Sequence, residues 1–146
     1  MAVALVVLSA CGDASTTEEA GQTAAVTAAV YPPRSLRDLS ALAARRADVR
    51  VVESSDIGAG GCRGKRVVVI VPAGTDDETV VSALARAWTD ERLDRTCGSA
   101  VFAYNDEAQL NGAFTAGALS MRERERVEVV VGNSLSDRRT VAEFPL

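Results

Sequence analysis

The chain has 146 residues, of which 47% are apolar and 25% are charged, a balance typical of a globular protein with one domain. Sixteen basic and twenty acidic residues give a formal net charge of −4, which excludes a general electrostatic attraction to nucleic acid or anionic lipid. The chain contains no histidine, which excludes Ser-His and Cys-His nucleophile pairs and imidazole metal sites.

The first eleven residues carry the most specific motif in the chain. An apolar run from Ala2 to Leu8 is followed by two small residues and a cysteine. Leu8-Ser9-Ala10-Cys11 resembles the lipobox of bacterial lipoproteins. The resemblance implies that residues 1–10 are a signal peptide cleaved before Cys11, and that a lipid on this cysteine tethers the exported protein to the cell membrane. The alternative is a cytosolic chain in which the first residues form an apolar strand and Cys11 is a buried thiol.

The segment before the motif is shorter than a usual signal peptide. A secretory signal normally opens with a positively charged region, whereas no basic residue precedes Arg34. The lipoprotein interpretation therefore predicts a translation start upstream of Met1.

Residues 11–34 are expected to form the lipidated N-terminus and a flexible linker. Between Gly12 and about Val30 the chain consists mostly of small, hydroxyl-bearing and acidic residues, with no aromatic residue. Such a segment buries too little apolar surface to offset the entropy of ordering. The pair Pro32-Pro33 then extends the chain and blocks a helix.

Residues 35–146 are expected to form a single domain. Ser35 and Asp38 are suited to start a helix, and the leucine spacing extends this helix from Leu36 to about Ala47. Two β-branched strands follow, joined by a glycine-rich loop; they are expected at 49–53 and 66–71, with the loop at 58–64.

The second helix has the clearest start signal. Thr75 and Glu78 have the spacing of a capping box, which predicts a helix from Asp76 to about Arg92. Asp106 is placed to cap a short helical turn that ends near residue 111. Further strands are expected at 100–104 and 127–131, with 141–144 as a candidate edge strand. The stretch 112–120 fits neither element, because its two glycines disfavour a helix.

This order of elements predicts an α+β domain. We expect a two-layer sandwich, with helices on one face of a roughly four-stranded mixed sheet. Because two of the strands are entirely apolar, a three-layer α/β arrangement is the alternative.

Several candidate motifs fail on residue type or context. The loop at 58–64 has Arg63 where a dinucleotide fingerprint needs its third glycine, and Arg66 where a phosphate loop needs a hydroxyl. The sequence therefore indicates a hairpin connection there. The alternating run at 122–126 indicates a solvated segment whose charges pair with each other. The pattern of acidic residues that calcium requires is absent from the sequence, so we expect no metal site.

The two remaining cysteines predict a disulfide. With Cys11 assigned to the lipid, Cys62 and Cys97 form an even pair, and such pairs are oxidised in exported proteins. Each cysteine precedes a strand, and the helix between these strands makes them parallel. Both cysteines would then lie at the same end of the sheet. The alternative is a pair of reduced thiols.

Two classes of function remain. The first is a membrane-anchored lipoprotein that acts as a binding or accessory module at the cell envelope. Its partner would be an envelope protein or a small ligand, with no nucleic acid and no cofactor. The second is a carboxylate-dependent envelope hydrolase, in which Asp106 or Glu107 acts as base beside Tyr104 and Asn105 at a strand end. A cleft holding a carboxyl group with a strongly raised pKa would favour the hydrolase.

Overall fold

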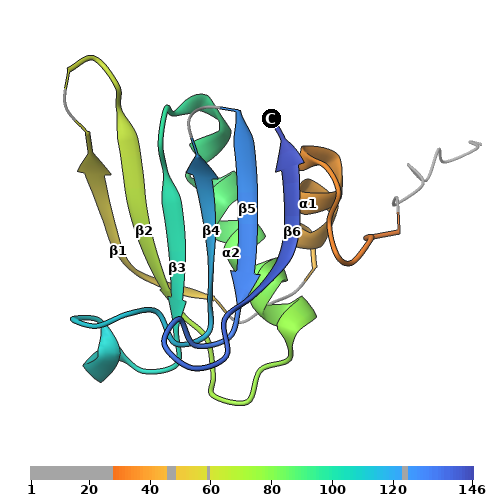
Figure 1. Cartoon of the computed structure of the whole chain (residues 1–146), viewed down its shortest axis with the longest axis vertical. Coiled ribbons are helices and arrows are strands. Elements are labelled where there is room, and N and C mark those ends of the chain that lie inside the picture. Colours follow the sequence, from red (N-terminus) through yellow and green to blue (C-terminus); the bar gives the residue numbers. More distant parts are fainter. Residues whose placement is uncertain (1–27, 46–48, 59, 123–124) are drawn as a thin grey trace, which may run out of the picture.

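The computed structural model describes residues 28–45, 49–58, 60–122 and 125–146. The described residues form a six-stranded sheet with strands in sequence order, and both helices lie behind it in the view of Figure 1. The strands are β1 (Arg50–Ile57), β2 (Gly64–Ile70), β3 (Ala100–Tyr104), β4 (Gly117–Arg122), β5 (Arg126–Val131) and β6 (Arg139–Pro145). The α-helices are α1 (Leu36–Ala43) and α2 (Asp77–Asp90), and two short 3₁₀ helices are η1 (Leu93–Arg95) and η2 (Glu107–Gln109).

The sheet is mixed, so the predicted α+β class is confirmed. β2 and β3 are parallel because α2 forms the crossover between them, and all the other neighbours are antiparallel. Neither helix is long and apolar enough to cross a membrane, a finding that covers the described part of the chain.

The predicted count of four strands is wrong, because the sheet has six. No clear sequence signal marks β4, which begins at Gly117 inside the ambiguous stretch. A Cβ at this position would lie 2.7 Å from the carbonyl oxygen of Val130 and 3.0 Å from Cγ1 of Val80. The glycine therefore marks a close approach between β4, β5 and α2, and not a break in a helix.

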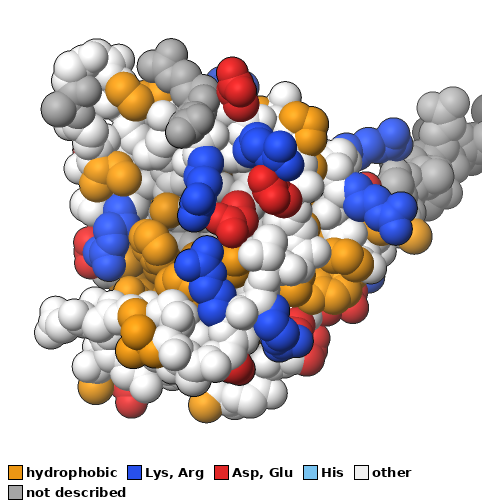
Figure 2. Space-filling view, in the orientation of Figure 1, with side chains coloured by type: hydrophobic (Ala, Val, Ile, Leu, Met, Phe, Trp, Pro, Cys, Tyr) orange, Lys and Arg blue, Asp and Glu red, His pale blue; other side chains and the backbone are white. Residues whose placement is uncertain are grey.

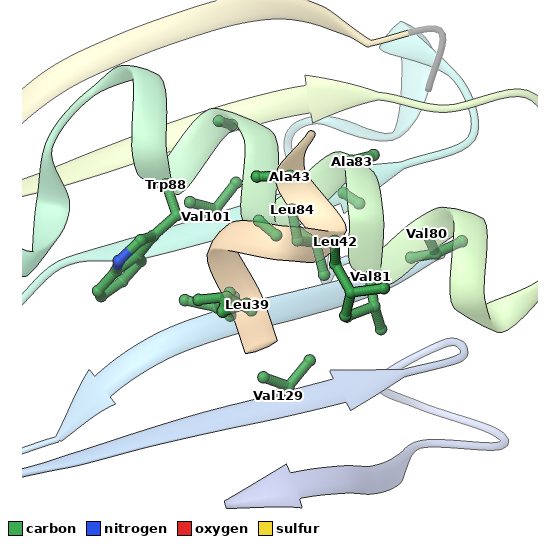
Figure 3. Close-up of a cluster of buried hydrophobic side chains, with 14 of the residues drawn as sticks. Leu39, Leu42, Ala43, Val80, Val81, Ala83, Leu84, Trp88, Val101 and Val129 are labelled. Carbon is green, nitrogen blue, oxygen red and sulfur yellow. The ribbon is translucent and has the colours of Figure 1, made fainter. Parts of the chain in front are cut away.

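The core lies between the sheet and the two helices (Figure 3). The apolar side of α2 belongs to this core, and Val81 and Leu84 are 0% exposed. From α1, Leu39 and Leu42 pack into the same cluster. The cluster is completed by alternate residues of the strands, among them Val67, Val69, Val101, Leu119, Val127, Val129 and Phe144.

The start of α2 differs from the expected capping box. Asp76, and not Thr75, is the N-cap: its carboxylate accepts the Thr79 N–H at 3.0 Å and the Thr79 hydroxyl at 2.7 Å. The hydroxyl of Thr75 instead donates to the carbonyl oxygen of Pro72 at 2.6 Å. The capping-box prediction failed because the Asp76 carboxylate accepts two hydrogen bonds from Thr79, which favours Asp76 as the N-cap.

The packed part of the chain begins before residue 35. Ala29 and Tyr31 are partly buried against the core, although both fall within the segment 11–34 expected to be a linker. Burial raises the pKa of the Tyr31 hydroxyl, and the nearby carboxylate of Asp77 acts in the same direction. The signal peptide 1–10, Cys11 and the linker up to residue 27 lie outside the described residues.

Candidate functional site

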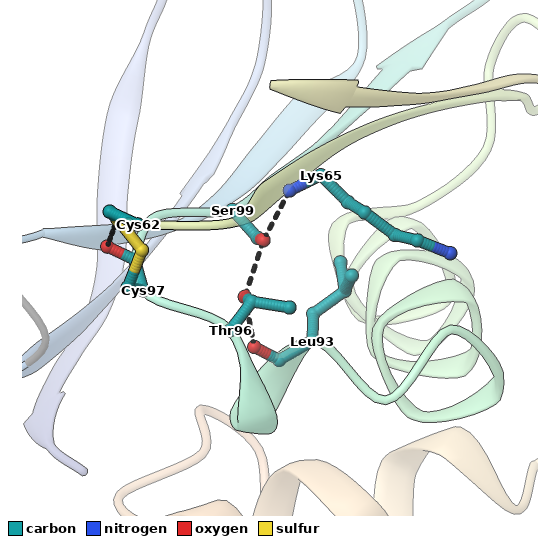
Figure 4. The surroundings of a disulfide bond; sticks show 6 residues. All are labelled: Cys62, Lys65, Leu93, Thr96, Cys97 and Ser99. Carbon is teal, nitrogen blue, oxygen red and sulfur yellow. Dashed lines mark hydrogen bonds between the residues drawn. A yellow bond between two sulfur atoms is a disulfide. The ribbon is translucent and has the colours of Figure 1, made fainter. Parts of the chain in front are cut away.

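The predicted disulfide between Cys62 and Cys97 is present, with 5.6 Å between the two Cα atoms (Figure 4). Cys62 precedes β2 by two residues and Cys97 precedes β3 by three. Because these strands are parallel neighbours, both cysteines lie at the same end of the sheet, as expected. The backbone N–H of Cys97 also donates to the carbonyl oxygen of Arg63 at 3.1 Å, which joins the two segments a second time.

Polar side chains behind the disulfide form a short chain of hydrogen bonds (Figure 4). Ser99 is 2% exposed, and its Oγ accepts the backbone N–H of Lys65 at 2.7 Å. The hydroxyls of Ser99 and Thr96 are bonded to each other, and the Thr96 hydroxyl donates to the carbonyl oxygen of Leu93 at 2.7 Å. These bonds connect β2, η1 and β3, so the buried serine has a structural role.

A glycine permits the close approach of β2 and β3 beside the disulfide. A Cβ on Gly64 would overlap the carbonyl oxygen of Gly98. A side chain at residue 64 would therefore force the two segments apart. The glycine-rich loop is a hairpin connection, as predicted, because Ile57 of β1 pairs with Gly64 of β2.

Lys65, the only lysine of the chain, contributes to polar contacts that link β1 and β2 to the end of α2. Lys65 Nζ lies 2.7 Å from Glu91 Oε2, and the Ser54 hydroxyl donates to the same oxygen at 3.3 Å. The hydrogen bond between Lys65 and Glu91 raises the pKa of Lys65 and lowers the pKa of Glu91. The shifts stabilise the charged form of both groups, as in a structural ion pair.

The hydrolase hypothesis places its site at the end of β3, where Tyr104 and Asn105 make structural contacts. Tyr104 is 2% exposed, and its hydroxyl donates to the carbonyl oxygen of Gly112 at 3.1 Å. The backbone N–H of Asn105 donates to Thr115 Oγ1 at 2.9 Å. Both bonds fold the β3–β4 connection back onto the end of β3.

The two carboxylates at this strand end also have partners. Asp106 caps η2 by accepting the N–H of Ala108 at 3.0 Å, and Glu107 forms an ion pair with Arg50 of β1. The two carboxyl groups with clearly displaced pKa values in the described residues are Asp76 and Glu91. The hydroxyl and N–H of Thr79 lower the pKa of Asp76, as Lys65 does for Glu91. A general acid needs a raised pKa, so neither group matches that role.

The face of the sheet away from α1 and α2, which we call the open face, is partly apolar. Four of its side chains are 5% exposed or less although they are not part of the core cluster; these are Val68, Tyr104, Ala118 and Val130. The β3–β4 connection covers part of this face. Phe114 from that connection stacks on Phe102 of β3, with 6.2 Å between the ring centroids.

Arginines and glutamates surround this apolar area, and Figure 2 shows them interspersed across the face. The Arg66 guanidinium lies 5.6 Å from the Phe102 ring centroid and 2.8 Å from Glu53 Oε1. Glu128 is approached by Arg122 at 3.1 Å and by Arg138 at 3.4 Å. Ion pairs therefore surround the apolar area on this face.

The open face corrects one prediction. In the run 122–126, the charges were expected to pair with each other. Arg122 instead pairs with Glu128 of β5, and Arg126 Nε lies 2.7 Å from Glu143 Oε1 of β6. The described ends of this run lie on neighbouring antiparallel strands, so their side chains reach cross-strand carboxylates more easily than each other. Residues 123–124 lie outside the described residues.

The described ranges contain no group of three or more Cys, Asp or Glu side chains that could hold a metal ion. Neither a scan against protein-family models nor searches of curated proteins and solved structures found a match to this chain. The candidate functional region therefore rests on the geometry of the open face.

Sequence patterns contain little indication of the open face. Phe102 and Phe114 are twelve residues apart and only one of them lies on a strand. The one available signal was the alternation in 100–104, which places Ala100, Phe102 and Tyr104 on one side and Val101 and Ala103 on the other. That alternation shows that β3 has two apolar faces, but it does not show which face the helices leave uncovered.

Proposed function

We propose that this protein is a membrane-anchored lipoprotein of the cell envelope whose folded domain acts as a binding or accessory module. The lipid would be attached to Cys11, and residues 12–27 would join it to the domain. The domain is a two-layer arrangement in which the helices cover one face of the sheet and the other face carries the binding surface.

The observation that carries the binding role is the composition of the open face. An aromatic pair, Phe102 and Phe114, lies beside the Arg66 guanidinium and the Glu53 carboxylate. Aromatic residues and arginine are enriched at protein interfaces. The carboxylates that would serve the alternative, an envelope hydrolase, cap η2 or pair with Arg50. A protein partner therefore suits this surface better than a hydrolytic reaction.

Replacing Cys11 by alanine is expected to release the protein from the membrane fraction. The substitution removes the thiol that would carry the lipid, and no other part of the proposal supplies an anchor. Cell fractionation followed by immunoblotting measures the distribution. Ser15→Ala is the matched control, because it changes a small side chain close to Cys11 in the sequence and keeps the thiol of Cys11. Equal membrane partitioning of the Cys11→Ala variant and the wild type would exclude lipid anchoring at this residue.

Photo-crosslinking in cells tests the open face. We expect a benzophenone side chain at position 114 to form an adduct with a particular envelope protein, because Phe114 lies on the proposed binding surface. The same group at Arg37, an exposed position on α1, is the control and should form no such adduct. The adducts are detected by gel shift and identified by mass spectrometry. Adducts of the same pattern and amount from both positions would contradict a specific role for the open face.

A further inference from the structure

β1 forms one edge of the sheet and carries apolar side chains that the domain leaves exposed. In the described residues it pairs with β2 alone. Val51 is 46% exposed and Ile57 is 41% exposed. An edge strand of eight residues presents unpaired backbone groups that can pair with another strand.

The charges on this edge are mostly neutralised within the domain. Arg50 forms an ion pair with Glu107, and Glu53 pairs with Arg66. Asp56 remains outside the ion pairs of the described residues. Charged side chains and bulges both protect edge strands, and β1 has a register shift between Val51 and Glu53; protection by free charge is weak, because Arg50 and Glu53 are paired within the domain.

The pairing with β2 assigns each side chain of β1 to a face of the sheet. A register shift between Val51 and Glu53 inserts one extra residue. Residues paired with Ile70, Val68, Arg66 and Gly64 lie on the open face; these are Arg50, Glu53, Ser55 and Ile57. Residues paired with Val69, Val67 and Lys65 lie on the helix face; these are Val51, Ser54 and Asp56.

Two depressions lie beside the start of β1. The first, of about 330 Å³, is lined by Val49, Arg50, Ile70 and Pro72. The second, of about 190 Å³, is lined by Val49, Val51, Arg86, Ala87 and Asp90. The first therefore includes residues of the open face, and the second lies between β1 and α2. A strand added to this edge directs alternate side chains to the two faces, and so toward both depressions.

We propose that two copies of this chain associate through antiparallel pairing of their β1 strands about a two-fold axis at Ser54. Counting the extra residue, this register places Arg50 opposite the partner's Ile57 and Val51 opposite the partner's Asp56. Glu53 lies opposite the partner's Ser55. In each pair the two residues lie on the same face of the joined sheet, and no two like charges lie directly opposite each other. The two sheets become continuous, with both helical layers on the same side.

The register matches the chemistry of the two depressions. The partner's Ile57 reaches the depression between Arg50 and Ile70, and its 41% exposed side chain becomes covered. The partner's Asp56 reaches the depression that contains the Arg86 guanidinium. Arg86 is 47% exposed and is held by Asp90 at 3.4 Å, a weak surface contact that leaves the guanidinium able to bind a second carboxylate. An isologous interface of this kind is the commonest route to a homodimer.

Sedimentation velocity of the full chain tests the pairing, with a Cys11→Ala background to keep the protein free of lipid. We expect a dimer that dissociates on dilution. Val51→Glu places one carboxylate opposite the partner's Asp56 at each end of the interface, and should raise the dissociation constant about tenfold, equal to about 1.4 kcal/mol. Val51→Lys offers a cation at the same position and should leave the dissociation constant equal or lower.

The matched pair separates the proposed register from a general loss of folding. Thermal unfolding at a concentration where the proteins are monomeric should give similar midpoints for both variants, because Val51 is largely exposed. A wild-type protein that is monomeric at every concentration would overturn the proposal. Equal weakening by Val51→Glu and Val51→Lys would overturn the register.

Cross-linking at the two-fold axis provides an independent measurement. In the same background, Ser54→Cys should form a covalent dimer with a short bismaleimide, since the two thiols face each other across the axis. Ser136→Cys, on the exposed β5–β6 loop, should remain monomeric. Cross-linking at residue 136 but not at residue 54 would show that the copies meet through another surface.

Discussion

Replacing Cys62 and Cys97 together by alanine is expected to lower the free energy of unfolding by about 4 kcal/mol. The bridge closes a loop of 35 residues that contains β2, α2 and η1. Without the bridge, the unfolded chain gains the freedom of this loop, while the neighbouring strands still pair in the folded state. Urea unfolding followed by circular dichroism measures the difference.

Reductant provides the matched control for the disulfide. Treating the wild type with dithiothreitol should lower its unfolding midpoint toward that of the Cys62→Ala/Cys97→Ala variant. The same treatment should leave the double variant unchanged, because its remaining cysteine, Cys11, has no partner in the chain. A wild type that unfolds at the same urea concentration with and without reductant would show that the bridge adds nothing to stability.

The disulfide could be predicted because it depended on the order of two strands and one helix along the chain. Two buried apolar strands separated by one helix must be parallel, and this fixes the end of the sheet at which Cys62 and Cys97 lie. That the two strands are also neighbours was not fixed by the sequence, since another strand could have been inserted between them. In the structure β2 and β3 are neighbours; β1 lies on the other side of β2, and β4 lies on the other side of β3.

β4 could not be recognised because its signal was weakened by small residues. It begins with Gly117 and Ala118, which have low strand propensity. Both are buried: α2 and β5 approach Gly117 closely, whereas Ala118 lies on the open face between Phe102 and Val130. Burial and cross-strand contacts with β3 and β5 replace the missing local preference. β1 is similar: Ser54, Ser55 and Asp56 are poor strand formers, yet they pair along the apolar β2.

The open face could not be predicted for a related reason. Its apolar centre combines strand residues with Phe114, which comes from a connection without regular structure. The ion pairs around it join different strands, as in Arg66 with Glu53 and Arg126 with Glu143. Contacts of this kind depend on strand order and register, which the residue pattern of a single strand does not contain.

Replacing Leu84 by alanine is expected to lower the free energy of unfolding by about 3–4 kcal/mol. Leu84 is 0% exposed at the centre of α2 and belongs to the cluster that joins this helix to the sheet. Its Cδ1 lies 3.4 Å from the position a Cβ would take on Gly117, so the side chain fills the space that the glycine leaves. Removing the side chain opens a cavity that the rigid sheet cannot close.

Arg86→Ala is the matched control for this substitution, because Arg86 lies on the exposed side of the same helix and pairs only weakly with Asp90. It should change the free energy of unfolding by no more than about 0.5 kcal/mol. Urea unfolding of both variants in the disulfide-bonded state measures the two effects. A Leu84→Ala variant as stable as Arg86→Ala would mean that α2 does not form the centre of the core. Because α2 also forms the crossover that makes β2 and β3 parallel, that outcome would undermine the arrangement of strands that places the disulfide, the open face and the β1 edge.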